Sequence, residues 1–356
     1  MLPYSNRIRE RIVSADKTII QTMRMMDETF TKLLLVFEGD DFLGIITNGD
    51  LQRAIIANLP FDTQIRRIVS HENKVYAKEG DDREAIKEWM LSKRAELMPV
   101  IDSAGRLVDV IFWDEVLSGA PGAANRPNLD LPVVIMAGGK GSRLRPLTNV
   151  LPKPLVPVGD KTILEIIMDQ FESIGCHKFY MSVNYKAEMI KYYIGQLPHR
   201  YDVVFFEEDK PLGTIGSLSL LRGKIDTPFF VSNCDSINEQ DYRDVWDYHV
   251  SNNNDMTVVT MVKSFNIPYG VIETGADGLL TAIREKPEQT YQVNTGVYIL
   301  NPGLIAEIPE GEFFHITQLM EKVKSKGGRV GCFPVSEHSW KDIGEWPEYL
   351  KAIKAL

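Results

Sequence analysis

A repeat in the first third of the chain is the feature that most restricts its fold. LLLVFEGDDFLGIITNGD at 33–50 aligns without a gap with LMPVIDSAGRLVDVIFWD at 97–114, an offset of 64 residues. Each copy reads as a strand, an acidic turn, a second strand and an acidic residue that opens a helix. A helical pattern precedes each copy, at 18–30 and at 82–94. Two copies predict a pseudo-symmetric α/β module.

This repeat resembles a tandem pair of CBS domains. The resemblance rests on GIITNGDL at 44–51 and MPVID at 98–102. In that family a Thr or Ser, with an Asp three residues on, contacts the ribose and phosphates of a bound adenine nucleotide. The resemblance therefore implies that Thr47 and Asp50 would hold such a nucleotide.

The second copy departs from the CBS pattern. It keeps Asp114, but Ile111 replaces the hydroxyl, and Asp109 stands where a strand residue would be apolar. The first copy is therefore the better candidate for a ligand. Asp50 and Asp114 could instead be ordinary helix N-caps, and the module could serve a structural or dimerising role. We expect the protein to be a homo-oligomer.

A linker follows the repeat. SGAPGAANRPNLDLP at 118–132 is rich in Gly, Pro, Ala and Asn and lacks amphipathic periodicity. We therefore predict a first module over 1–119, a linker over 120–131 and a second domain over 132–356. A chain of 356 residues is long enough for both domains.

The second domain alternates apolar strands with helical patterns. Strands are predicted at 133–137, 178–183, 203–207, 228–233, 257–262 and 293–300, and helices at 164–175 and around 215–222. This alternation predicts an α/β fold with a mostly parallel sheet covered on both faces. Ligands in such sheets bind beyond the carboxyl ends of the strands.

A glycine loop follows the first of these strands, in VVIMAGGKGSRLRPLTNVLPKPLVP at 133–157. Its glycines let the backbone turn sharply and bring N–H groups close to phosphate oxygens. Arg143 and Lys153 add positive charge, and the prolines on either side of Lys153 restrict its backbone. The loop matches neither GxxxxGK[ST] nor GxGxxG. It therefore predicts a phosphate site of another kind.

AGGKGSRLRPLT followed by PKP resembles the signature of sugar-1-phosphate nucleotidyltransferases. The resemblance implies a Rossmann-like, GT-A-type domain. It continues along the chain in PLGTIGSL at 211–218, SNCD at 232–235, PYGVIE at 268–273, EKP at 285–287, NTGVY at 294–298 and WKDIG at 340–344.

The resemblance implies a role for each matching residue. Arg143, Lys153 and Lys286 would be the catalytic cations, with Lys286 on the sugar phosphate. Asp235 and Asp342 would bind Mg²⁺, a hard cation that prefers oxygen ligands. The residues implied on the nucleotide side are Ala137, Gly138, Gly139, Gly141, Pro211, Gly213, Thr214 and Asn233. Those implied on the sugar side are Gly270, Glu285 and Asn294.

Net charge and composition exclude several classes of function. The formal net charge of −9 argues against a surface for nucleic acid or anionic membrane. No apolar run approaches the roughly 20 residues of a membrane span. The start of the chain lacks the apolar core of a signal peptide, and the three cysteines are far apart. We therefore expect a cytoplasmic protein with reduced thiols.

The substrates follow from resemblance alone. The CBS pair, NYKAEMI at 184–190 and EEDKPLGT at 207–214 resemble the bacterial glucosamine-1-phosphate guanylyltransferases that feed legionaminic-type nonulosonic acid synthesis. This implies GTP and glucosamine-1-phosphate, with mannose-1-phosphate or another pair as the alternative. A catalytically silent adenine-nucleotide sensor is the alternative of another class. Cys234 reads as a small buried hydrophobe, and His315 and His338 as structural.

Overall fold

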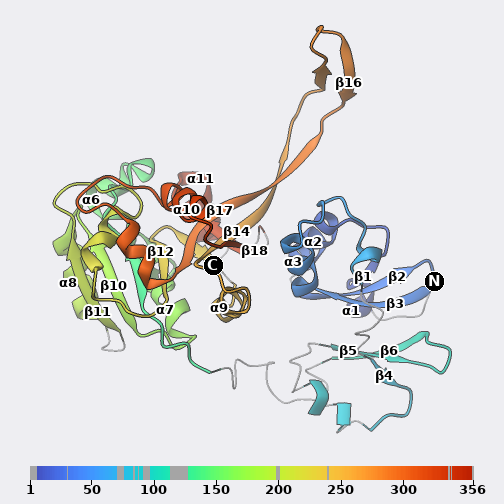
Figure 1. Cartoon of the computed structure of the whole chain (residues 1–356). Helices are drawn as coiled ribbons and strands as arrows, with labels where there is room; N and C mark the ends of the chain where they lie inside the picture. The colour runs from blue at the N-terminus through green and yellow to red at the C-terminus, as the bar shows by residue number, and fades with distance from the viewer. Residues whose placement is uncertain are drawn as a thin grey trace. The chain divides into compact units, whose positions relative to one another are not determined.

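The computed structural model describes residues 6–29, 31–69, 76–82, 85–86, 88–90, 97–112, 127–197, 201–238, 240–335, 337 and 339–354. The chain divides into two compact units, Met1–Arg126 and Pro127–Leu356 (Figure 1). This boundary falls within the predicted linker, of which residues 120–126 lie outside the described part.

The first unit contains two small sheets of the same design. β1 (Ile12–Ser14) pairs parallel with β2 (Leu33–Glu38), which pairs antiparallel with β3 (Asp41–Thr47). β4 (Ala77–Lys78), β5 (Leu97–Ile101) and β6 (Leu107–Phe112) repeat this pattern. The helices are α1 (Asn6–Arg9), α2 (Ile19–Glu28), α3 (Asn48–Ile56) and the 3₁₀ turn η1 (Ile65–Arg67). The predicted repeat is therefore present in the fold.

The two copies pack against each other through one apolar cluster. Leu35 and Phe37 of β2 lie in it with Leu107 and Phe112 of β6, all buried. The predicted helix over 82–94 lies partly outside the described residues.

Strand pairing corrects the gapless alignment of the repeat. Val36 pairs with Gly44, whereas Val100 pairs with Asp109, so the second strands align at an offset of 65 residues rather than 64. The hairpin turn is one residue longer in the second copy. Asp109 consequently stands where the first copy has a glycine, beside the register shift in its hairpin.

This correction also changes which residue replaces the hydroxyl. Leu33 pairs with Thr47, and Leu97 pairs with Phe112. Phe112, not Ile111, is thus the counterpart of Thr47, and the second copy still lacks the hydroxyl.

A seven-stranded sheet organises the second unit, in the order β11-β10-β7-β12-β17-β14-β18. The strands are β7 (Val133–Met136), β10 (Lys178–Val183), β11 (Asp202–Glu207), β12 (Phe229–Asn233), β14 (Met256–Asn266), β17 (Glu288–Leu300) and β18 (Val330–Val335). Of these, β17 is the strand that runs against the others. The prediction of a mostly parallel sheet is confirmed.

Helices cover both faces of this sheet. They are α6 (Leu147–Val150), α7 (Ile163–Glu172), α8 (Ala187–Gln196), α9 (Tyr242–Ser251), α10 (Ile316–Ser325) and α11 (Trp346–Lys354), with 3₁₀ turns η2 (Ser142–Leu144), η3 (Lys153–Leu155), η4 (Gly216–Leu221) and η5 (Pro302–Glu307). Minor strands are β8 (Pro157–Val158), β9 (Lys161–Thr162), β13 (Ser236–Asn238), β15 (Val271–Thr274), β16 (Leu280–Arg284) and β19 (Trp340–Asp342). Among the helices described, none is both long and apolar enough to cross a membrane.

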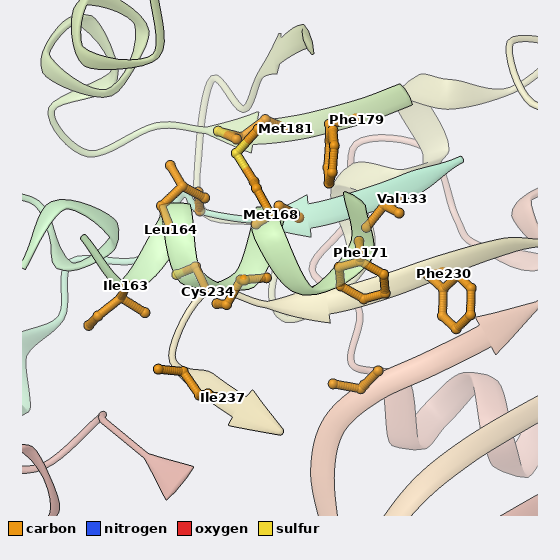
Figure 2. Close-up of a cluster of buried hydrophobic side chains, with 14 of the residues drawn as sticks. Val133, Ile163, Leu164, Met168, Phe171, Phe179, Met181, Phe230, Cys234 and Ile237 are labelled. Atoms are coloured by element: carbon orange, nitrogen blue, oxygen red, sulfur yellow. The ribbon is translucent and has the colours of Figure 1, made fainter. Parts of the chain in front are cut away.

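The core lies between α7 and the sheet. A capping box between Thr162 and Glu165 starts α7. The helix then places Leu164, Met168 and Phe171 against the sheet, as Figure 2 shows. On the other face η4, η5 and α10 supply a second cluster. The sheet is therefore fixed from both sides, which holds its carboxyl edge in place.

Two strands extend well beyond their predicted ends. β14 and β17 pair continuously from Thr260 with Asn294 to Asn266 with Glu288, and the β15–β16 hairpin lies beyond them. Figure 1 shows this ribbon projecting from the sheet. We call residues 263–291 the arm.

Candidate active site

Two adjoining clefts open at the carboxyl end of β7, where ligands bind in folds of this class. The first, of about 320 Å³, lies over the glycine loop, and we call it the loop cleft. The second, of about 560 Å³, lies beside β17, and we call it the β17 cleft. Both are lined by Arg143, Thr214, Asn233 and Asp235. These shared residues make the two clefts halves of one site.

Local geometry explains why glycine occupies two of the lining positions. Gly141 has φ +60°, and a Cβ there would lie 2.9 Å from the Cβ of Lys153. Gly213 has φ +84°, and a Cβ there would lie 2.6 Å from the carbonyl oxygen of Phe314. Side chains are strained at such φ values and would clash here. Gly141 therefore lets the glycine loop pack closely on the PKP segment, and Gly213 lets the PLGT segment pack closely on the residues that precede α10.

A lysine and two carboxylates meet at the junction of the clefts. The Nζ of Lys153 lies 2.6 Å from Oδ2 of Asp235. β13 pairs with β19, which brings Asp342 opposite Ser236. A Cβ at Gly344 would lie 2.6 Å from Oδ1 of Asp342, 3.0 Å from the Lys153 Nζ and 3.4 Å from Oδ2 of Asp235. The charged groups of Lys153, Asp235 and Asp342, which come from distant segments, thus lie close together around Gly344.

Electrostatics at this junction follow from burial and proximity. Burial raises the pKa of the Asp342 carboxyl, and the charge of Asp235 raises it further. A hydrogen bond from the Gly344 N–H opposes this shift. The Arg143 guanidinium donates to Glu345 at 2.8 Å, and this bond raises the pKa of Arg143. Lys153 and Arg143 are therefore each paired with a carboxylate, of Asp235 and Glu345 respectively.

The pair of carboxylates fits Mg²⁺. In proteins Mg²⁺ is commonly held by one or two carboxylates, with water and substrate phosphates as its other ligands. Within the described ranges, no group of three or more His, Cys, Asp or Glu could hold a metal. The donor set of Asp235 and Asp342 suits a shared protein–substrate metal site rather than a closed protein cage.

Most of the predicted site residues line the two clefts. The loop cleft is lined by Gly138, Gly139, Gly141, Arg143, Lys153, Pro211, Gly213, Thr214, Asn233 and Asp235. Asn294 and Asp342 line the β17 cleft. Asn294 also bonds within the protein, because its amide donates to the Tyr298 hydroxyl at 2.8 Å. Ala137 is fully buried just after β7.

Two residues predicted on the sugar side and one predicted catalytic cation lie elsewhere. Gly270, Glu285 and Lys286 are exposed and belong to the arm. None of them is among the lining residues of either cleft. The structure therefore does not bring them together with the rest of the predicted site of the same chain.

Sequence reasoning missed Glu208, which lines the loop cleft. Its carboxylate is buried and accepts hydrogen bonds from the Ser182 hydroxyl at 2.5 Å and from the Leu212 N–H at 3.1 Å. The available signal was its place directly after a strand and shortly before PLGT. His315, predicted to be structural, lines the β17 cleft. Burial raises the pKa of the Cys234 thiol to about 12, so this thiol stays neutral.

In the first unit, Thr47 and Asp50 cap α3. The Thr47 N–H donates to Asp50 at 2.8 Å, and the Asp50 N–H donates to the Thr47 hydroxyl at 3.2 Å. Arg53 pairs with the same carboxylate at 2.5 Å. Thr47 is therefore the N-cap of α3, and Asp50 is the third helical residue of a capping box rather than the N-cap itself. Nucleotide binding at Thr47 and Asp50 stays a prediction.

Comparison with known proteins agrees with this fold. A family model described as nucleotidyl transferase matches residues 132–356, and a CBS domain model matches residues 9–57. The chain belongs to the nucleotidyl transferase family. The CBS match covers the first copy of the repeat, and the second copy is supported by its strand order.

Two curated relatives are mannose-1-phosphate guanyltransferases. The one from Pichia angusta is 33% identical over 235 residues, covering 62% of this chain and 62% of the relative. The one from Yarrowia lipolytica is 34% identical over 231 residues, covering 61% of each. This chain thus spans less than two thirds of the length of these relatives. The crystal structure of HddC from Yersinia pseudotuberculosis matches with a TM-score of 0.50 and 28% identity, over 63% of this chain and 99% of HddC.

Proposed function

We propose that this protein joins GTP to a hexose-1-phosphate, giving a GDP-sugar and pyrophosphate. The observation that carries the proposal is the convergence of Lys153, Arg143, Asp235 and Asp342 where the loop cleft meets the β17 cleft. Family membership and the names of the curated relatives support it.

The proposed reaction does not require a general base. The second pKa of a phosphate monoester is about 6, so the attacking sugar phosphate is already an anion near neutral pH. The protein must hold two polyanions in line and stabilise the charge that develops on pyrophosphate. We assign that task to Lys153 and Arg143, and we propose that the backbones of Gly138 and Gly139 approach the base or ribose.

Asp235 and Asp342 would hold Mg²⁺. When bound there, the metal would offset the repulsion between the phosphates of the two substrates. The Lys153 ammonium lies 2.6 Å from Asp235 and neutralises one carboxylate of the pair. We therefore propose magnesium as the cofactor.

Glu208 supports guanine as the base. Guanine presents two adjacent donors, N1–H and N2–H₂, on its pairing edge. A carboxylate accepts hydrogen bonds only, and one already oriented by Ser182 and Leu212 retains lone pairs for a ligand. The pairing edges of uracil and thymine present one donor between two acceptors. A buried carboxylate in the loop cleft is therefore a better match for guanine.

Substitution Glu208→Gln tests this base assignment. Losing a hydrogen bond to a charged acceptor costs about 1.5–3 kcal/mol, so kcat/KM for GTP should fall roughly 10- to 150-fold, with a smaller change for UTP. Glu207→Gln is the matched control, because that neighbouring carboxylate is exposed and pairs with Lys191. An equal loss for GTP and UTP, or no loss, would refute the role of Glu208.

For the sugar we propose glucosamine-1-phosphate, with mannose-1-phosphate as the alternative that the relatives' names favour. A pyrophosphate-release screen decides between them. It crosses GTP, UTP, CTP, dTTP and ATP with mannose-, glucose-, glucosamine- and N-acetylglucosamine-1-phosphate, each with and without Mg²⁺. Release in no combination would favour the silent sensor.

We further propose that the first CBS copy binds an adenine nucleotide at Thr47 and Asp50. AMP or ATP should then raise the thermal midpoint of the full chain, since a ligand that binds only the folded state stabilises it. Thr47→Ala should reduce the shift. No shift at millimolar ligand would leave these residues as a helix cap. The free state of all three cysteines agrees with the cytoplasmic location that we propose.

A further inference from the structure

The arm exposes an unusual amount of apolar surface. Seven of its large hydrophobic side chains are exposed to solvent: Phe265, Tyr269, Ile272, Leu279, Leu280, Ile283 and Tyr291. Ile272 and Ile283 are opposite each other in the β15–β16 hairpin and are 64% and 63% exposed. Exposed apolar side chains gathered on one projecting element are typical of an interaction site.

The arm also carries a strained lysine, between β16 of the hairpin and β17. Lys286 has φ +43°, a left-handed conformation that is uncommon for residues other than glycine. Such strain gathers at ligand-binding positions, because the surrounding structure must maintain it. Glu285 lies beside it, and a Cβ at Gly270 would lie 3.0 Å from the Glu285 carboxylate. The arm thus presents the Lys286 ammonium together with apolar side chains.

This lysine stands far from the β17 cleft of its own chain. Asn294 lines that cleft. It lies in β17, eight residues after Lys286 in the sequence. At a strand rise of about 3.3 Å per residue, the separation is roughly 25 Å. The continuous pairing of β14 with β17 over this length keeps the ribbon extended (Figure 1).

The β17 cleft has few cationic side chains. A sugar-1-phosphate carries close to two negative charges near neutral pH. Among the described lining residues the basic side chains are Arg143 and His315, and Asp235 and Asp342 are acidic. Arg143 is already paired with Glu345 at 2.8 Å. The sugar-phosphate half of the site is therefore short of cationic side chains, and Mg²⁺ at Asp235 and Asp342 would be shared with the triphosphate.

We propose that the arm completes the β17 cleft of a second copy of this chain, placing Lys286 on the sugar phosphate there. This rests on the function proposed above. Reciprocal exchange about a two-fold axis gives each cleft one arm and buries both apolar hairpins. A second copy is the occupant that meets both needs, because it supplies a cleft of matching charge and receives an arm in return.

Mixed dimers test the exchange. Asp235→Asn disables the cleft, and Lys286→Ala disables the arm, so each variant alone should lose most of its activity. The two are co-expressed with different tags, and the heterodimer is isolated by two affinity steps. With exchanged arms, one of its two sites combines an intact cleft with an intact arm, so about half of the wild-type activity should return.

Each other outcome overturns a stated claim. A heterodimer as inactive as its parents means that each arm serves its own cleft, and normal activity of Lys286→Ala means that the arm serves none. Wild-type protein in the same assay separates these results from failure of the proposed function, since an inactive wild type would refute the function itself.

A second measurement concerns the apolar surface. Changing Ile272 and Ile283 together to Thr should shift the wild-type dimer to monomer in analytical ultracentrifugation, and should lower activity as Lys286→Ala does. Tyr192→Ser is the control, because Tyr192 is 73% exposed on α8, outside the arm, and the dimer should persist. A wild-type monomer, or a dimer that survives the double substitution, would overturn the proposal.

Discussion

Substitution of Lys153 by Met removes the charge at the centre of the site while keeping a side chain of similar length. Lys153 is 8% exposed and lies 2.6 Å from Asp235, which is 19% exposed. At an effective dielectric constant of about 20, the attraction across that distance is about 6 kcal/mol. Desolvation offsets much of it, but removing one partner of a buried pair still costs about 3–5 kcal/mol of stability.

The same change should also reduce turnover. Loss of one preorganised group that stabilises transition-state charge lowers kcat by about 10²- to 10³-fold. Lys161→Met is the matched control, since Lys161 also lies 2.6 Å from an acid, Asp169, but is 53% exposed. An exposed pair contributes about 0–1 kcal/mol, so this variant should keep its stability and turnover.

Two assays follow both variants, urea unfolding and pyrophosphate release with GTP. The expected result is a large fall in both quantities for Lys153→Met and little change for Lys161→Met. If Lys153→Met keeps turnover within about threefold of the wild type, the lysine does not act on the triphosphate. If its unfolding free energy is unchanged, the buried Lys153–Asp235 pair does not stabilise the fold.

The metal site and the catalytic independence of the second unit can be tested more simply. Asp235→Asn should lower Mg²⁺-dependent pyrophosphate release by roughly 100-fold or more, and near-normal turnover would remove Asp235 from the metal site. A chain that begins at Pro127 should retain some transferase activity, because the second unit carries every proposed catalytic group; complete inactivity of a folded truncation would contradict this.

Much of the second unit could be predicted from its sequence. Buried parallel strands are near-continuous apolar runs, so the strand predicted at 178–183 coincides with β10. The length of β14 and β17 could not be predicted, because most residues of the arm are not buried and no simple apolar pattern marks where the sheet ends. η4 was predicted as a helix of unspecified kind and forms a 3₁₀ helix.

The site was predictable where short motifs carry its residues. Asp235 and Asp342 are more than a hundred residues apart, so their spacing could not pair them, and only the family resemblance did. In the structure the pairing of β13 with β19 brings them together. The role of Glu208 could not be predicted, because a lone acid after a strand is usually solvated. Only its burial against Ser182 distinguishes it. The position of Lys286 depends on the arm, which no local pattern describes.

The most direct test of the central claim follows the phosphates of GTP. Wild-type protein is incubated with a sugar-1-phosphate, Mg²⁺ and GTP labelled at either the α or the γ phosphorus. Attack at the α phosphorus predicts that the α label enters a GDP-sugar and the γ label enters pyrophosphate. An α label that remains in GTP, or that appears only as GDP or GMP, would contradict the assignment of this protein as a sugar-1-phosphate nucleotidyltransferase.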